Sequence, residues 1–310
     1  MTWQTISVID PISPAIERVK TLLFRPFDLE KWFTIGFCAW LANLGRGGGN
    51  PFSNIARQHH QSCGQLKNFI TEHLPFIIIF CIIGTITVMV IGLLVTWLSS
   101  RGRFMFLHCV AENKAEVKLP WAKFKIQANS LFLFRIVVGM ISLVTIILPA
   151  IFGSISIYMM SCSSSLNLMQ LFSGITFFLI TTIFIIVFAM ISKFTTDFVV
   201  PIMFLTGLKT VDGWRQFRNI LFTHKGAIAL YILFQIVIGM AISAIVITAT
   251  LLTCCMACCF LAIPYIGTVV LLPLLVFKRS YSLYFLRQFG PQFDVFGGGN
   301  VNVAEPVITI

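Results

Sequence analysis

The sequence contains very little charge. Asp, Glu, Lys and Arg together make up 11% of the 310 residues, and only 11 residues are acidic, whereas charged residues average about 25% of a soluble domain. So few charged side chains cannot cover the surface of an ordinary soluble protein. Apolar residues take their place, at 57% of the chain with 31 Phe. This composition predicts an all-α, polytopic membrane protein, because helices satisfy their own backbone hydrogen bonds in lipid.

Motifs of known enzymes are also missing from the sequence. It contains no Gly-x-Ser-x-Gly nucleophile elbow. The glycine-rich GRGGGN at 45–50 lacks the Lys and Ser/Thr of a phosphate loop. His59, His60, Cys63 and His73 lie close together, but their spacing matches no standard metal site. We therefore predict a protein that is not an enzyme and has no cofactor.

Long apolar runs predict about six transmembrane helices, since a span needs about 20 residues. Ala227–Phe277 is too long for one span and predicts two, with a turn within Leu251–Ile263 and Pro264 opening the second helix. The shorter Trp32–Leu44 predicts either a short span or a helix lying in the membrane interface. The remaining runs are Leu74–Leu98, Leu131–Tyr158 and Cys162–Ser192.

The distribution of basic residues predicts the orientation. With six spans and both termini in the cytoplasm, only three of the 22 Lys and Arg residues fall in outer loops, all within Gly45–His73. This is a strong positive-inside bias. The net charge of +11 then needs no nucleic acid as partner. The lipid bilayer is the expected partner, and anionic lipid headgroups can meet the basic inner surface.

Three stretches of the sequence share one plan, which predicts an internal repeat. Each unit has an amphipathic helix, an outward span, an outer turn and a returning span with an inward extension. The amphipathic segments are SPAIERVKTLLF, PWAKFKIQANSLF and DGWRQFRNILF, and the extensions are SSRGRFMFLHCV, TTDFVVPIMFL and KRSYSLYFLRQF. We expect the amphipathic segments on the inner membrane surface. Residues 1–290 form one domain in this prediction, and residues 291–310 form a flexible tail.

A charge cluster is predicted where the three extensions converge. Asp197 occupies the place that Arg101 or Arg103 takes in the first unit and Lys278 and Arg279 take in the third. A carboxylate near the membrane is costly unless it is paired. We expect an ion pair that locks the units together, with Arg103 or Arg279 as first choices. The alternative is a gated polar site for a solute, a proton or a headgroup.

The sequence CCMACC is the main cysteine feature. It places Cys254, Cys255, Cys258 and Cys259 in the predicted last outer turn. Periplasmic cysteines can form disulfides, paired thiols can bind copper or zinc, and buried cysteine also packs as a small apolar residue. All three interpretations remain open at this point.

Four segments resemble an uncharacterised family of bacterial integral membrane proteins. They are DLEKWFTIGFCAWLANLGRGGGN, RGRFMFLHCVAENKAEVKLPW, DFVVPIM and AIPYIGTVVLLPLLVFKRSYSLYFLRQFG. The resemblance covers about residues 8–295, and that family brings no established activity. More distantly, the plan is similar to the membrane domain found beside glycerophosphoryl diester phosphodiesterase domains. The catalytic barrel has no counterpart here, so phosphodiesterase activity is not implied.

Three classes of function are therefore open. A non-enzymatic envelope or membrane-organising protein comes first, because no catalytic set is visible. A transporter or lipid-handling protein, with a polar site near Asp197, comes second. A membrane enzyme comes last.

Overall fold

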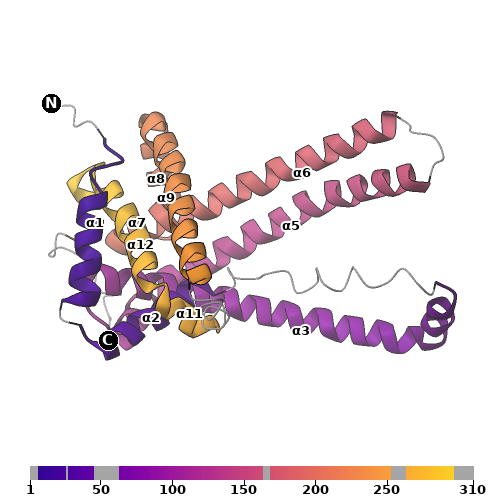
Figure 1. Ribbon diagram of the computed structural model, residues 1–310, viewed down its shortest axis with the longest axis horizontal. Helices are drawn as coiled ribbons and strands as arrows, with labels where there is room; N and C mark the ends of the chain where they lie inside the picture. Colours follow the sequence, from indigo (N-terminus) through magenta and orange to yellow (C-terminus); the bar gives the residue numbers. More distant parts are fainter. Residues whose placement is uncertain (1–5, 26, 45–62, 163–167, 253–262, 297–310) are drawn as a thin grey trace, which may run out of the picture.

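The described part of the chain is helical throughout. A computed structural model describes residues 6–25, 27–44, 63–162, 168–252 and 263–296, and it confirms the all-α fold within these ranges (Figure 1). Two elements, η1 and η3, are π-helical turns, and η4 is a 3-10 turn. The elements are α1 (Ile12–Val19), η1 (Lys20–Phe24), α2 (Leu29–Asn43), α3 (Cys63–Glu112), α4 (Lys118–Lys123), α5 (Lys125–Cys162), α6 (Leu168–Phe194), η3 (Thr195–Val199), α7 (Val200–Thr206), α8 (Thr210–Thr223), α9 (Lys225–Leu252), α11 (Pro264–Val270), α12 (Leu272–Arg287) and η4 (Pro291–Phe293).

Local sequence explains where some of these helices begin and end. The Asp28 side chain accepts hydrogen bonds from the backbone N–H groups of Glu30 and Lys31, at 2.9 and 3.4 Å, and so starts α2. Gly207 ends α7 in the left-handed conformation, with φ at +70°, and its N–H donates to the carbonyl of Met203. Glycine adopts this conformation without steric strain, which makes it a common helix terminator.

The predicted start of the last apolar helix is confirmed. α9 ends at Leu252, and α11 begins at Pro264, which stands in the first helical turn where a missing N–H costs no hydrogen bond. The turn predicted between them falls almost entirely on residues 253–262, outside the described part of the chain.

The buried core lies at one end of the long helices. Every residue from Ser99 to Ala111 is buried, and so is every residue from Asp197 to Phe204. α12, the short helices α1, α2 and α8, and the first half of α9 complete this core. We call the assembly the hub. Its described residues fall within 6–44, 98–131, 194–238 and 264–296.

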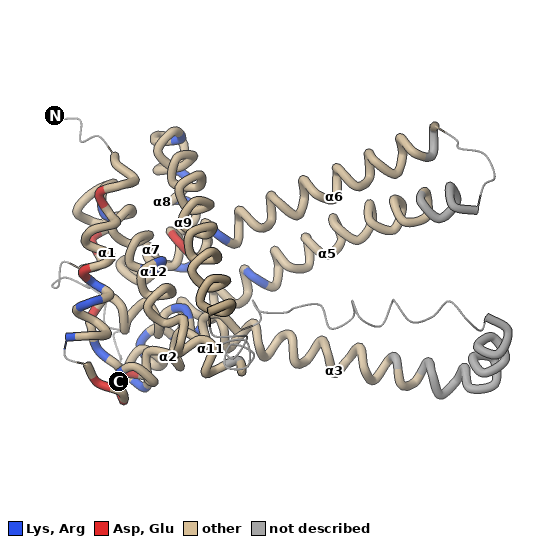
Figure 2. The backbone as a smooth tube through the Cα atoms, viewed as in Figure 1, with Lys and Arg blue, Asp and Glu red and all other residues tan. Residues whose placement is uncertain are grey.

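The hub carries long apolar helices that it does not cover. α3 and the antiparallel pair α5–α6 extend from it as arms, which comprise residues 63–97, 132–162 and 168–193, while α9 runs across their direction (Figure 1). Figure 2 shows that charged residues concentrate in the hub and at its junction with the arms. Between residues 79 and 98, 136 and 156, and 171 and 192, the arms carry no charged residue.

Four helical segments of the described chain are long and apolar enough to cross a membrane. They are Ile82–Glu112, Lys125–Ser156, Leu171–Thr206 and Lys225–Leu252. In the most apolar stretch of each, only 6% of the residues are buried in the first three and 17% in the last. Their apolar side chains therefore need an outside apolar medium, which a bilayer supplies. Of the six predicted spans, Trp32–Leu44 and the segment after Pro264 are not among these four.

α2 packs inside the hub, although the sequence predicted a short span or an interfacial helix. Its 15 residues reach about 22 Å, less than the roughly 30 Å hydrocarbon core. It runs antiparallel to the buried end of α3: Lys31 Nζ donates to Asn113 Oδ1 at 2.9 Å, and Ser99 Oγ donates to the Ala42 carbonyl at 3.1 Å. Gly102 permits this contact, because a Cβ at that position would stand 2.5 Å from the Ala42 nitrogen.

The predicted amphipathic segments turn their apolar faces toward protein and not toward lipid. They form α1 with η1, α4 with the start of α5, and α8. Ala15, Phe124 and Phe217 from these faces are each at most 2% exposed in the hub. Helical periodicity indicates an apolar environment but does not distinguish lipid from protein. Only a few members of the predicted faces stay exposed, such as Ile16 and Phe222.

The two ends of the described chain meet in the hub. The Tyr281 hydroxyl donates to the Val8 carbonyl at 2.9 Å. The Gln288 side chain donates to the Ser7 carbonyl and accepts from the Ser7 N–H, both at 2.8 Å. The helix α1 therefore packs against α12, the last long helix of the chain.

Arg18 fastens α1 to the end of α3. Its guanidinium donates to the carbonyls of Val110 and Ala111, at distances of 2.6–3.0 Å, and satisfies acceptors that a helix leaves open at its C-terminus. Burial lowers the pKa of the guanidinium from its ordinary value, yet arginine remains protonated. The Arg18 charge also lies over the ring of Phe296, at 5.1 Å. The beginning of the predicted flexible tail, 291–310, is therefore packed in the hub as far as Phe296.

Candidate functional site

A small cavity marks the place where the three extensions meet. It has a volume of about 100 Å³ and receives Arg103 from α3, Asp197 from η3, and Lys278 and Arg279 from α12. Four of the five residues predicted to form a charge cluster thus line one cavity. The other lining residues are Ala42, Asn43, Phe106, Thr196 and Leu275.

Asp197 belongs to a closed ring of hydrogen bonds beside this cavity. Lys193 Nζ lies 2.6 Å from Asp197 Oδ2, and the Tyr231 hydroxyl donates to the same oxygen at 3.1 Å. Gln235 Nε2 donates to the Tyr231 oxygen at 3.1 Å, and Lys193 Nζ donates to Gln235 Oε1 at 3.2 Å. The ring joins the α6–η3 segment to α9 and satisfies a buried carboxylate, as burial in a low-dielectric interior requires.

The ion-pair partner of Asp197 in the structure differs from the expected one. Arg103 and Arg279 were the first choices, but the partner is Lys193, four residues earlier in the same segment. Residues spaced i and i+4 on a helix are neighbours, so this pair was visible in the sequence. The repeat instead pointed to a partner in another unit. Tyr231 and Gln235 have the same spacing on α9, but nothing in the sequence tied them to Asp197.

The backbone around Asp197 is a π-helical turn. The N–H of Val200 donates to the carbonyl of Thr195, five residues earlier. The cause lies at Pro201, because in a regular α-helix a proline ring clashes with the carbonyl four residues before it, here that of Asp197. A wider turn accommodates the proline, and the helix continues as α7 to Thr206.

Two arginines of the cavity are buried, with 5% of Arg103 and 7% of Arg279 exposed, whereas Lys278 is exposed. Arg279 Nη1 donates to the Thr196 carbonyl at 2.6 Å, next to Asp197. Three cationic residues and one carboxylate therefore line the cavity. Two guanidinium groups among the lining residues have the geometry that suits a small anion such as a phosphate group.

Arg101, the fifth predicted member of the cluster, lies elsewhere. Its guanidinium contacts the rings of both Trp97 and Trp121, at 4.5 and 4.7 Å from the ring centroids. Such cation–π contacts stabilise a buried cation without a carboxylate. Arg101 thus joins α3 to α4 and takes no part in the cavity.

The predicted cysteine and histidine features remain untested. Cys254, Cys255, Cys258 and Cys259 lie outside the described residues, and so do His59 and His60. No group of three potential metal ligands occurs in the part of the chain that the structure describes. A different pair of cysteines does come together there, Cys38 and Cys109, with their sulfur atoms 3.8 Å apart between α2 and α3.

These features define a polytopic helical membrane protein with a folded hub at one end of its membrane helices. The chain belongs to DUF7544, a family of unknown function, which matches residues 6–272. No curated protein and no solved structure was found to match it. Membership of an uncharacterised family is thus confirmed, whereas nothing supports the distant resemblance to the membrane domain of glycerophosphoryl diester phosphodiesterases.

Proposed function

We propose that this protein is a non-enzymatic, membrane-organising protein of the bacterial inner membrane, and that its hub binds the phosphate of anionic lipids. The cavity lined by Arg103, Lys278 and Arg279 carries this proposal. Charge-assisted hydrogen bonds from arginine to phosphate are among the stronger ones in proteins. The cavity lies next to Lys193, where the uncharged stretch of α6 ends, so it stands at the depth of lipid headgroups.

The proposal includes an orientation with the hub in the cytoplasm and the arms in the bilayer. Basic residues gather in the hub, while the described middle parts of the arms carry none (Figure 2). This is the asymmetry expected of a cytoplasmic hub. The proposal also includes the three-unit repeat, and the support for it is that α3, η3 and α12, which carry the three predicted extensions, all contribute residues to one cavity.

Cysteine labelling should test the orientation. In a Cys-depleted protein, a cysteine at Ser164, between the two helices of the α5–α6 arm, should react with an impermeant thiol reagent on intact spheroplasts. Cysteines at the exposed positions Lys118 and Lys209 of the hub should react only after lysis. Labelling of both hub positions in intact spheroplasts would place the hub outside and contradict the proposal.

Lipid binding should depend on the exposed cation of the cavity. Lys278→Gln should weaken retention of phosphatidylglycerol about ten- to a hundredfold, since a hydrogen bond to a charged group contributes roughly 1.5–3 kcal/mol. The measurement is native mass spectrometry of the full chain with phosphatidylglycerol against phosphatidylcholine, with inorganic phosphate as a competitor. Arg218→Gln, which removes an exposed charge from α8 outside the cavity, is the matched control. An equal loss in both variants would show only a general charge effect and contradict the site.

A transporter or lipid-handling protein remains the second candidate, because Asp197 lines the same cavity. A carboxylate beside cations can exchange a proton or a solute during transport. This role predicts that Asp197→Asn folds normally but abolishes uptake or lipid transfer in proteoliposomes. The membrane-organising role predicts a loss of stability instead.

A further inference from the structure

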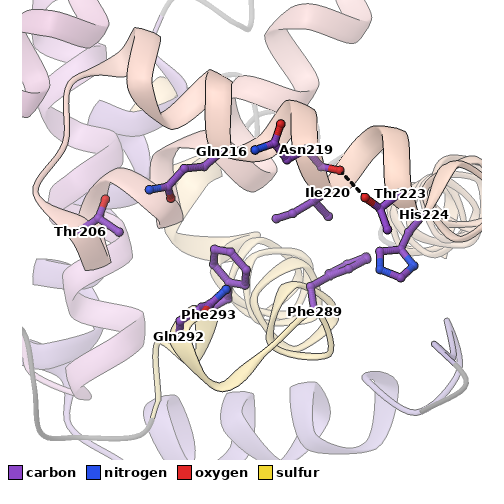
Figure 3. Close-up of a pocket in the computed structure, with 9 residues that line it drawn as sticks. All are labelled: Thr206, Gln216, Asn219, Ile220, Thr223, His224, Phe289, Gln292 and Phe293. Atoms are coloured by element: carbon purple, nitrogen blue, oxygen red, sulfur yellow. Dashed lines mark hydrogen bonds between the residues drawn. The ribbon is translucent and has the colours of Figure 1, made fainter. Parts of the chain in front are cut away.

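A second and larger pocket lies in the hub, between α8 and the chain that follows α12 (Figure 3). Its volume is about 520 Å³, within the range of roughly 300–1,000 Å³ that is typical of small-molecule sites. No residue of the cationic cavity contributes to it. Its lining consists of Thr206, Gln216, Asn219, Ile220, Thr223, His224, Phe289, Gln292 and Phe293.

The lining of this pocket contains no Lys, Arg, Asp or Glu, although the chain has a net charge of +11. α8 carries Arg215 and Arg218, and neither belongs to the lining. An anionic or acidic ligand would therefore find its counter-charges elsewhere on the hub. The pocket offers neutral hydrogen bonds and apolar surface, so it suits a neutral polar ligand.

Three carboxamides supply most of the hydrogen-bonding capacity. Gln216 and Asn219 stand three residues apart on α8, which places them on one face of the helix. Gln292 faces them from η4 across the pocket (Figure 3). Each carboxamide carries two N–H donors and a carbonyl acceptor. Neighbouring hydroxyl groups on a ring present the complementary donors and acceptors.

Aromatic rings form the opposite side of the pocket. Phe293 is 6% exposed and Phe289 is partly exposed, and both come from the chain at and after the end of α12. The His224 ring lies 5.4 Å from the Phe289 ring, between centroids. The C–H face of a saturated ring packs well on such surfaces, through apolar burial and weak C–H contacts.

We propose that this pocket binds a polyhydroxylated ring, a sugar or a cyclic polyol, either free or as the headgroup of a glycolipid. The amides of α8 would bind its hydroxyl groups while Phe289 covers its C–H face. His224 directly precedes Lys225, where the apolar helix α9 begins, so the pocket adjoins one of the four segments that are long and apolar enough to cross a membrane. This site is independent of the anion site proposed above.

Saturation-transfer NMR on the full chain in phosphatidylcholine nanodiscs tests the proposal, with myo-inositol, methyl glucoside and adenine as probes. A polyol should receive saturation. Asn219→Ala and Phe289→Leu should each weaken binding of the polyol about two- to tenfold. This is the effect of losing one net hydrogen bond or a comparable contact. Asn129→Ala and Phe80→Leu change the same residue types at exposed positions outside the pocket and should leave the signal unchanged.

A second set of nanodiscs, containing glucosyl-diacylglycerol, separates the two sources of the ring. Displacement of the soluble polyol by this lipid, and not by diacylglycerol, identifies a headgroup site, and no displacement identifies a free ligand. The proposal is wrong if neither polyol receives saturation from the unsubstituted protein while a melting curve shows that this protein is folded in the nanodiscs. It is also wrong if the pocket variants behave like their controls, or if adenine alone binds.

Discussion

Replacing Asp197 with alanine is expected to lower the free energy of unfolding by about 3–5 kcal/mol, the usual cost of breaking a buried ion pair. Lys193 lies 2.6 Å from the carboxylate, with 26% of its side chain exposed, and would lose its countercharge. Tyr231 would lose the acceptor of its hydroxyl. The measurement is denaturant or thermal unfolding of the purified protein in detergent, followed by tryptophan fluorescence and circular dichroism.

A surface ion pair supplies the matched control. Arg215 and Asp212 are 3.8 Å apart and well exposed, so Asp212→Asn should change the stability by less than about 1 kcal/mol. Asp197→Asn should be destabilising, and adding Lys193→Gln should recover part of the loss, as expected for coupled residues. Recovery by Arg279→Gln, and not by Lys193→Gln, would instead show that the pair forms between η3 and α12.

The second large effect is expected at Gly102. An alanine Cβ there would lie 2.5 Å from the Ala42 nitrogen and from the Leu41 carbonyl carbon. Both are backbone atoms, so α2 and α3 would have to move apart. Overpacking typically costs about 1–3 kcal/mol, occasionally more, and we expect Gly102→Ala at the upper end of that range. Thermal unfolding in detergent measures it.

Gly92 gives an internal control on the same helix. A Cβ at Gly92 meets no atom within 4 Å, and alanine has the higher helix propensity. Gly92→Ala should therefore be neutral or slightly stabilising. Equal stability of Gly102→Ala and Gly92→Ala would show that α2 does not pack against α3 at this point.

The class of the fold could be predicted because it depends on composition and local signals. Scarce charge and long apolar runs indicate membrane helices whatever their partners. A first-turn proline acts on its own backbone, which is why Pro264 marked the start of α11 correctly. Asp197 was predictable as a site residue for a comparable reason, since an isolated acid among apolar residues needs a partner wherever the chain places it.

The packing of the hub and the partners of the site residues depend on which helices meet. The periodicity of the sequence does not contain that information. Ala15 and Phe217 belong to apolar faces that suited a membrane surface equally well, but protein covers them. Gly102 stands between two arginines, and its local sequence gives no sign of the close contact with α2. Tyr231 lies 34 residues from Asp197 in the sequence, and the polar pocket between α8 and η4 joins segments that share no motif.

The contact between the two ends of the hub also sets an order of events during synthesis. The Ser7 backbone bonds with Gln288, 281 residues later, and Val8 bonds with Tyr281, 273 residues later. The segment around Ser7 therefore lacks its partner until synthesis has reached Tyr281 and Gln288, after all the apolar helices between them have been made. Contacts so distant in sequence form slowly, and a chain that stops before Leu272 would leave the α1 surface without its α12 partner, a target for chaperones and proteases.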